Sequence, residues 1–142
     1  MFEEYVFDSN IDAETYMKFR ESVGWGLYPL DEAEITLKNS SVKVVCHKDG
    51  KIIAFSRALW DGGYTAYIAD VIVDEAYRGQ GLGKEIVRRV IEQIENQMKS
   101  GWKIRMVLNA APGKEPFYEK FGFVKRPNEN AGHGMHRDFL KD

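Results

Sequence analysis

The residues best suited to chemistry form a glycine-rich segment, YRGQGLGK, at positions 77–84. Its glycines allow positive φ angles and a close approach of the backbone to a ligand. An amphipathic helix is expected directly after it, and the first N–H groups of a helix have no partners within the helix. Arg78 and Lys84 add positive charge at the same place. The segment therefore predicts a backbone cradle for a phosphate or pyrophosphate group.

Two common phosphate-binding patterns do not fit this segment. The P-loop pattern consists of a glycine, four residues of any type, and then Gly-Lys followed by Ser or Thr. With Gly83-Lys84 as its end, it needs glycine at 78 and Ser or Thr at 85, where the chain has Arg78 and Glu85. The dinucleotide pattern G-x-G-x-x-G needs a third glycine at Lys84 or Ile86. A nucleotide-binding switch is disfavoured for the same reason.

Strands are expected before the glycine-rich segment. Residues 42–47 and 52–59 are rich in β-branched side chains, and Asp49-Gly50 between them predicts a hairpin. Asp61-Gly62-Gly63 predicts the next turn, which leads into a strand over residues 64–73. Together these segments predict three successive antiparallel strands.

Helices are expected at the start of the chain and after the glycines. Residues 12–23 predict a helix with Asp12 as its N-cap, and a shorter helix is expected from Asp31, as its N-cap, to about Lys38. Apolar residues recur at helical spacing over 84–99.

The remaining elements complete a mixed sheet. A strand is expected over 103–108, a short helix closed by Gly122 over 114–120, and a return of the final residues to the sheet. Strands in hairpins followed by a β-α-β unit predict a mixed sheet with helices on both faces.

Length and composition predict one domain over residues 1–142 and argue against several kinds of partner. The formal net charge of −2 argues against nucleic acid or an anionic membrane surface as the main partner. No apolar run is long enough to span a membrane, and the N-terminus does not resemble a signal peptide, so a cytoplasmic location is expected. The single cysteine, Cys46, excludes an internal disulfide, and the histidines lack the spacing of metal ligands.

Residues 78–83, Arg-Gly-Gln-Gly-Leu-Gly, match the Arg/Gln-x-x-Gly-x-Gly/Ala signature of the GNAT superfamily of N-acetyltransferases. Residues 117–123, Phe-Tyr-Glu-Lys-Phe-Gly-Phe, resemble a second element of that family, at the separation that the family shows. The resemblance covers about residues 42–125. It implies an α/β (by some schemes α+β) fold with a mainly antiparallel twisted sheet, splayed between the fourth and fifth family strands.

The resemblance also implies how acetyl-CoA binds as cosubstrate, without a metal. The loop amides hold the pyrophosphate, the strand before the loop pairs with the pantetheine arm, and an asparagine contacts the pantetheine. The implied binding residues are Val71, Ile72, Val73, Arg78, Gly79, Gln80, Gly81, Leu82, Gly83, Lys84 and Asn109.

Acetyl transfer to an amine needs a proton acceptor, an oxyanion donor and a proton for the leaving thiolate. The resemblance implies Tyr118 as general acid, with packing as its alternative role, and a bulge or splay around Asp70–Val71. Asp70 is a candidate general base, but it could instead be structural or bind the amine, and water could relay the proton. Trp25 and Tyr28 are candidate acceptor-site residues, with packing again as the alternative.

These inferences lead to one functional hypothesis and one alternative. The chain is expected to move an acetyl group from acetyl-CoA directly to the primary amine of a small molecule. The alternative is a non-catalytic acetyl-CoA-sensing or protein-interaction module. No nucleic-acid or membrane partner is expected, and a homodimer is possible because dimers are common in the family.

Overall fold

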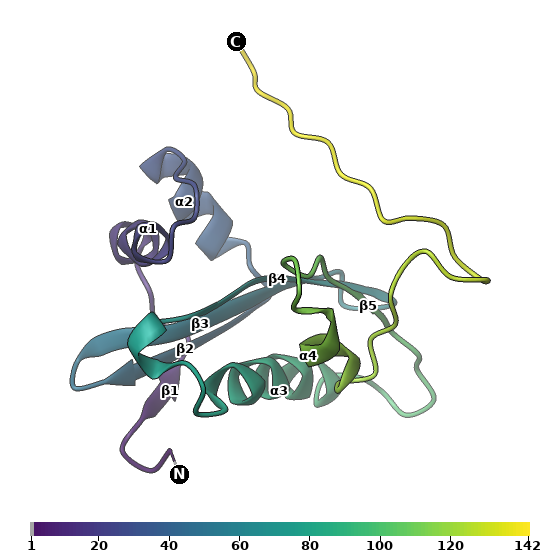
Figure 1. Ribbon diagram of the computed structural model, residues 1–142, viewed down its shortest axis with the longest axis horizontal. Helices are drawn as coiled ribbons and strands as arrows, with labels where there is room; N and C mark the ends of the chain where they lie inside the picture. Colours follow the sequence, from purple (N-terminus) through teal and green to yellow (C-terminus); the bar gives the residue numbers. More distant parts are fainter. Residues whose placement is uncertain (1) are drawn as a thin grey trace. The chain divides into compact units, whose positions relative to one another are not determined.

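Up to Val107, the chain is built on a five-stranded sheet with the strand order β1-β2-β3-β4-β5 (Figure 1). The computed structural model describes residues 2–142. The strands are β1 (Val6–Asp8), β2 (Val42–Lys48), β3 (Lys51–Trp60), β4 (Thr65–Val73) and β5 (Arg105–Val107). Neighbours from β1 to β4 are antiparallel, and β5 runs parallel to β4. The prediction of a mixed, mainly antiparallel sheet is confirmed.

Helices cover both faces of this sheet, as predicted. The helices α1 (Ala13–Ser22) and α2 (Leu30–Lys38) lie on one face, and α3 (Leu82–Glu95) lies on the other (Figure 1). Under α1 and α2 the core consists mainly of Tyr16, Phe19, Leu37, Val45, Phe55 and Ile72. The apolar stripe of α3 is buried and comprises Leu82, Ile86, Val87, Val90 and Ile94. Among residues 2–142, no helix combines the length and the apolar character needed to cross a bilayer.

The hairpin predicted at Asp49-Gly50 joins β2 to β3. Asp49 has φ 52° and Gly50 has φ 76°, which is the double positive φ of a type I′ turn. The side chain of Cys46, in β2, is fully buried, so its prediction as a core residue is confirmed. Burial raises the pKa of the Cys46 thiol to about 11.

The sequence did not predict β1. This strand has only three residues, and its pairing with β2 aligns Val6 with His47 and Asp8 with Val45. A contact of 2.9 Å between His47 Nε2 and Asp8 Oδ1 reinforces that pairing. A strand of three residues is too short to show a periodic pattern in the sequence. It forms because it can pair with the edge of β2.

A second unit begins at Leu108 and contains the helix α4 (Glu115–Glu119). The predicted short helix is confirmed, and Gly122, with φ 89°, follows its end. The predicted return of the final residues to the sheet is wrong, because the only β pairing among the described residues after β5 is an isolated bridge between Asn128 and Ala131. The apolar side chains of this tail bury little surface that could offset the entropy of ordering a strand. Their exposed fractions are 93% for Met135, 76% for Phe139 and 91% for Leu140.

The two predicted helix caps have different outcomes. Asp12 caps α1, since its Oδ1 accepts a hydrogen bond of 2.7 Å from the Thr15 amide. The prediction of Asp31 as a cap is wrong, because α2 begins at Leu30 after Pro29. Pro29 fixes the entry to the helix through its restricted φ of −53°, and no side chain caps α2.

Replacement of Asp12 by alanine is expected to lower the free energy of unfolding by about 1 kcal/mol, because the Thr15 amide loses its acceptor. Chemical denaturation measures this change. Glu34→Ala is the matched control, since it removes an exposed carboxylate from α2 beyond the first turn of the helix. Equal losses in the two variants would contradict the capping role.

Candidate functional site

The glycine-rich segment links the 3-10 helix η1 (Glu75–Tyr77) to α3. Gly79 has φ 80° and Gly81 has φ 84°, so both are left-handed, and Gly81 is the N-cap of α3. A Cβ atom added at either glycine would meet nothing within 4 Å. These positions therefore require glycine for its positive φ, and the space above the loop is open to a ligand.

The first turn of α3 offers backbone donors to that space. The first helical hydrogen bond of α3 runs from the Glu85 amide to the Gly81 carbonyl, at 3.1 Å. The amides of Leu82, Gly83 and Lys84 precede it, at the positions where a helix leaves N–H groups without intrahelical acceptors. Such donors, at the positive end of the helix dipole, favour an anion.

One carboxylate lies in this first turn, and two arginines neutralise it. Glu85 accepts hydrogen bonds from Arg88 at 2.7 Å and from Arg89 at 2.9 Å. The hydrogen bond from Arg88 is the main reason that the pKa of Glu85 is lowered. Since the Glu85 carboxylate pairs with Arg88 and Arg89, the N-terminal amides of α3 are available to an anionic ligand.

Two predicted binding residues also fasten the loop. The Arg78 Nε donates to the Val73 carbonyl at 3.1 Å, and the Gln80 Oε1 accepts from the Tyr5 hydroxyl at 3.1 Å. The Tyr5 ring lies edge-on to Tyr77, with 6.4 Å between centroids. The loop is thus tied to the end of β4 and to the chain before β1. The Lys84 side chain is exposed.

The sheet opens between β4 and β5, as predicted. Their pairing extends only from Thr65–Arg105 to Tyr67–Val107, whereas β4 continues to Val73. The Asp74 amide donates to the Ile53 carbonyl of β3 at 2.8 Å. In an antiparallel strand, the backbone N–H and C=O groups of successive residues point to opposite edges of the strand. The backbone groups of Ile72 therefore also point to β3, and those of Val71 and Val73 point to the open edge. Two of the three predicted strand residues are therefore oriented to pair with an extended ligand.

The bulge predicted around Asp70–Val71 is confirmed. Ser56 pairs with Val71 and Arg57 pairs with Ala69, so Asp70 is an extra residue in β4. Its φ of 51° is left-handed, which is uncommon for a residue with a Cβ atom.

The Asp70 side chain points to the face covered by α1, where three donors engage it. Arg57 Nε lies 2.7 Å from Oδ2, Arg20 Nη1 lies 3.4 Å from Oδ1, and the Tyr16 hydroxyl donates to Oδ2. Only 11% of the Asp70 side chain is exposed. Both oxygens are thus occupied, a geometry that favours the structural role left open by the sequence.

The sequence-based reasoning missed Tyr16, Arg20 and Arg57. Only Arg57 carried a visible signal, since it is a charged residue within the apolar run of β3.

The aromatic faces of Trp25 and Tyr28 already contact a cation of the same chain. The Arg20 guanidinium carbon lies 5.4 Å from the Trp25 ring centroid and 5.2 Å from that of Tyr28. The Tyr28 hydroxyl also donates to the Tyr16 hydroxyl at 3.1 Å. Trp25 and Tyr28 therefore enclose Arg20, and their predicted contact with an acceptor stays a prediction.

Tyr118 and Asn109 belong to the second unit. Tyr118 lies in α4, and its ring contacts Phe117 and Phe123, at centroid distances of 4.9 and 6.3 Å. Burial raises the pKa of Tyr118 above its usual value of 10.0. The phenol is therefore protonated at neutral pH and can donate a proton. Asn109 follows the end of β5 by two residues.

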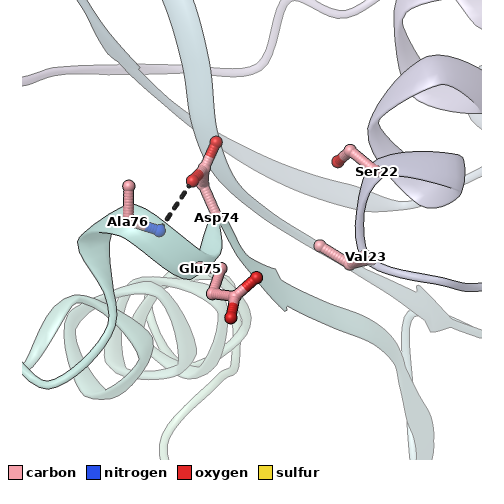
Figure 2. Close-up of a pocket in the computed structure, with 5 residues that line it drawn as sticks. All are labelled: Ser22, Val23, Asp74, Glu75 and Ala76. Atoms are coloured by element: carbon pink, nitrogen blue, oxygen red, sulfur yellow. Dashed lines mark hydrogen bonds between the residues drawn. The ribbon is translucent and has the colours of Figure 1, made fainter.

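A pocket with a volume of about 430 Å³ lies between the end of α1 and η1 (Figure 2). Ser22 and Val23 face Asp74, Glu75 and Ala76 across it, and Asp74 accepts a hydrogen bond of 2.9 Å from the Ala76 amide.

A second pocket, of about 610 Å³, lies between α2 and β3. Its lining residues are Pro29, Asp31, Glu32, Ile35, Thr36, Asn39, Arg57 and Leu59. Through Arg57, this pocket adjoins the Asp70 carboxylate.

Comparison with known proteins identifies the family. Residues 39–125 match the family model described as "Acetyltransferase (GNAT) domain". The chain belongs to the GNAT family. The resemblance read from the sequence motifs is confirmed, and this GNAT protein is an acetyltransferase.

Individual relatives agree with this assignment. An uncharacterized N-acetyltransferase of Pyropia yezoensis, ycf52, is 35% identical over 129 residues, which cover 88% of this chain and 72% of the relative. A histone acetyltransferase of Glycine max is 30% identical, covering 92% of this chain and 60% of that protein. The crystal structure of a protein described as a probable acetyltransferase, from meticillin-resistant Staphylococcus aureus, superposes with a TM-score of 0.80 at 27% identity. That match covers 95% of this chain and 98% of the other.

GNAT enzymes take acetyl-CoA as cosubstrate, and the first unit of this GNAT protein fits that molecule. The left-handed Gly79 and Gly81 leave open space beside the first-turn amides of α3, and this geometry suits a pyrophosphate group. The edge of β4 from Ile68 to Val73 has no β5 partner, so an extended amide-containing arm can pair with it.

Proposed function

We propose that this GNAT protein transfers an acetyl group from acetyl-CoA directly to the primary amine of a small molecule. One observation carries the proposal. The open first turn of α3 and the unpaired edge of β4 lie at the two ends of one short connection, residues 74–81. A pyrophosphate and the pantetheine arm attached to it need this arrangement of donors.

In this proposal each part of the site has a separate role. The amides of residues 79–84 hold the pyrophosphate, and the main chains of Val71 and Val73 pair with the pantetheine. The Val71 N–H donates to the thioester oxygen, where negative charge develops. As the amine nitrogen bonds to the carbonyl carbon, the C–S bond breaks. Tyr118 gives its proton to the CoA thiolate, and the amine loses its own proton to water.

Two observations support a small cationic acceptor. The pocket between α2 and β3 has the apolar side chains of Ile35 and Leu59 in its lining, and both are partly exposed, at 60% and 42%. Asp31 and Glu32 supply negative charge to the same lining. An amine with an apolar body complements both features. The net charge of −2 gives no general attraction for a polyanion-bound protein.

An acceptor screen tests this function. Release of free thiol from acetyl-CoA is measured with polyamines, amino acids, aryl amines, a lysine peptide and a histone-tail peptide. We expect the fastest release with a small amine. Faster release with the histone-tail peptide would contradict a small-molecule acceptor. It would favour a histone acceptor, as in the name of the Glycine max relative. Binding of acetyl-CoA without turnover on any acceptor would support the non-catalytic alternative.

A further inference from the structure

A cluster of charged and hydroxyl side chains lies beneath the bulge in β4. It consists of Asp70 and the three residues that donate to it, Tyr16, Arg20 and Arg57, and we call it the Asp70 clamp. The Tyr16 side chain is fully buried, and only 14% of each arginine side chain is exposed. Buried charges this close to one another are costly to separate, so the clamp is a rigid feature of the site.

The clamp acts on a residue whose backbone is strained. A left-handed φ is strained for a residue with a Cβ atom, and such a conformation persists only where its surroundings enforce it. The donors of the clamp come from two separate elements, with Tyr16 and Arg20 on α1 and Arg57 on β3. Because α1 packs on one face of the sheet and β3 is the strand that pairs with β4, the donors fix the Asp70 carboxylate from two directions.

The conformation of Asp70 decides the direction of the next peptide group. The extra residue at position 70 shifts the register, so that Val71 turns its N–H to the open edge of β4. Without the bulge, the backbone groups on both sides of position 70 would alternate regularly between the two edges of β4. The N–H of residue 71 would then point to β3 instead.

We propose that Tyr16, Arg20 and Arg57 are positioning residues, which act through Asp70 to aim the Val71 N–H at the open edge of β4. In the same proposal Asp70 is a positioning residue and not the general base. The inference deepens the proposed function, on which it rests for the presence of a thioester beside Val71.

The geometry of the carboxylate separates this role from proton transfer. A general base needs an oxygen that can reach the proton of the substrate amine. Oδ2 of Asp70 accepts from Arg57 and Tyr16, and Oδ1 lies 3.4 Å from Arg20. Burial raises the pKa of the Tyr16 phenol, and the hydrogen bond to Asp70 adds to that increase, so Tyr16 stays protonated as a donor.

Conservative variants test the proposal kinetically. Tyr16→Phe removes one hydroxyl, Arg57→Lys keeps the charge but loses the planar donor, and Asp70→Asn keeps the shape of the side chain. Each is expected to lower kcat roughly 10- to 100-fold through misplacement of the reacting groups, with the KM for acetyl-CoA changed by less than about threefold. The pH profile of Asp70→Asn should keep its shape. Tyr64→Phe, in a half-exposed tyrosine outside the clamp, is the matched control.

A general base gives a different pattern. Asp70→Asn alone would then be severely slowed and would lose the acidic limb of its pH profile, while Tyr16→Phe would react nearly at the wild-type rate. That result would overturn the positioning role.

Hydrogen exchange tests the clamp in the absence of any substrate. The amides of residues 68–74 are compared with those of the hairpin between β2 and β3 by mass spectrometry. Tyr16→Phe and Asp70→Asn should accelerate exchange in residues 68–74 at least tenfold and leave the hairpin unchanged. Unchanged exchange in both variants would overturn the proposal. If wild type acetylates no amine, the proposed function fails, and the exchange result still decides whether the clamp holds the bulge.

Discussion

The variant Tyr118→Phe is expected to bind acetyl-CoA as wild type does and to turn over about 10²–10⁴-fold more slowly. The substitution removes the phenolic proton donor, and the remaining ring keeps its contacts with Phe117 and Phe123. Because burial raises the pKa of Tyr118 above 10.0, the phenol is fully protonated at neutral pH. The activity that depends on this proton should therefore fall only in alkaline solution. Thiol release measures turnover, and a thermal shift with acetyl-CoA measures binding.

Tyr64→Phe again provides the control, since it removes a phenol from a half-exposed side chain directly before β4. Its turnover should equal that of wild type. A Tyr118→Phe rate within about threefold of wild type, under conditions where chemistry limits the rate, would assign Tyr118 to packing alone.

Gly81→Asp is expected to abolish acetyl-CoA binding. In wild type, a ligand at 100 times its Kd stabilises the folded state by about 2.7 kcal/mol, which raises the Tm by several degrees. Aspartate at position 81 adds a Cβ at φ 84° and a negative charge beside the first-turn amides of α3. The charge repels the pyrophosphate, so the acetyl-CoA-dependent increase in Tm should disappear.

Two further variants separate charge from backbone strain. Gly81→Asn has the shape of aspartate without its charge, and it should retain part of the thermal shift. Gly62→Asp introduces the same charge at φ 82°, in the turn between β3 and β4, and it should keep the full shift despite a lower Tm. No thermal shift in wild type would refute acetyl-CoA binding by this loop.

Local signals in the sequence predicted most of the first unit. Asp49-Gly50 lies between two β-branched runs, and it forms the type I′ turn that such a dipeptide favours. The glycines at 79 and 81 have the positive φ that their spacing before a helix indicated. The bulge at Asp70 was expected from the family resemblance, and no pattern of the residues themselves marks it.

Contacts between distant residues could not be predicted in the same way. Tyr16 and Arg20 lie more than 45 positions before Asp70 and reach it only because α1 packs across the sheet. A tyrosine and an arginine four residues apart in an amphipathic helix resemble ordinary boundary residues. The role of Asp70 was therefore open in the sequence, where only its position on the strand was visible.

The burial of Cys46 has a practical consequence for measuring turnover. Thiol reagents react with the thiolate, and a pKa of about 11 leaves roughly one Cys46 in 10⁴ ionised at pH 7, within a side chain that solvent does not reach. Since Cys46 is the only cysteine, a chromogenic disulfide added to the folded protein should detect coenzyme A alone. In the absence of substrate, slow labelling of the same residue would instead measure how often β2 separates from its neighbours.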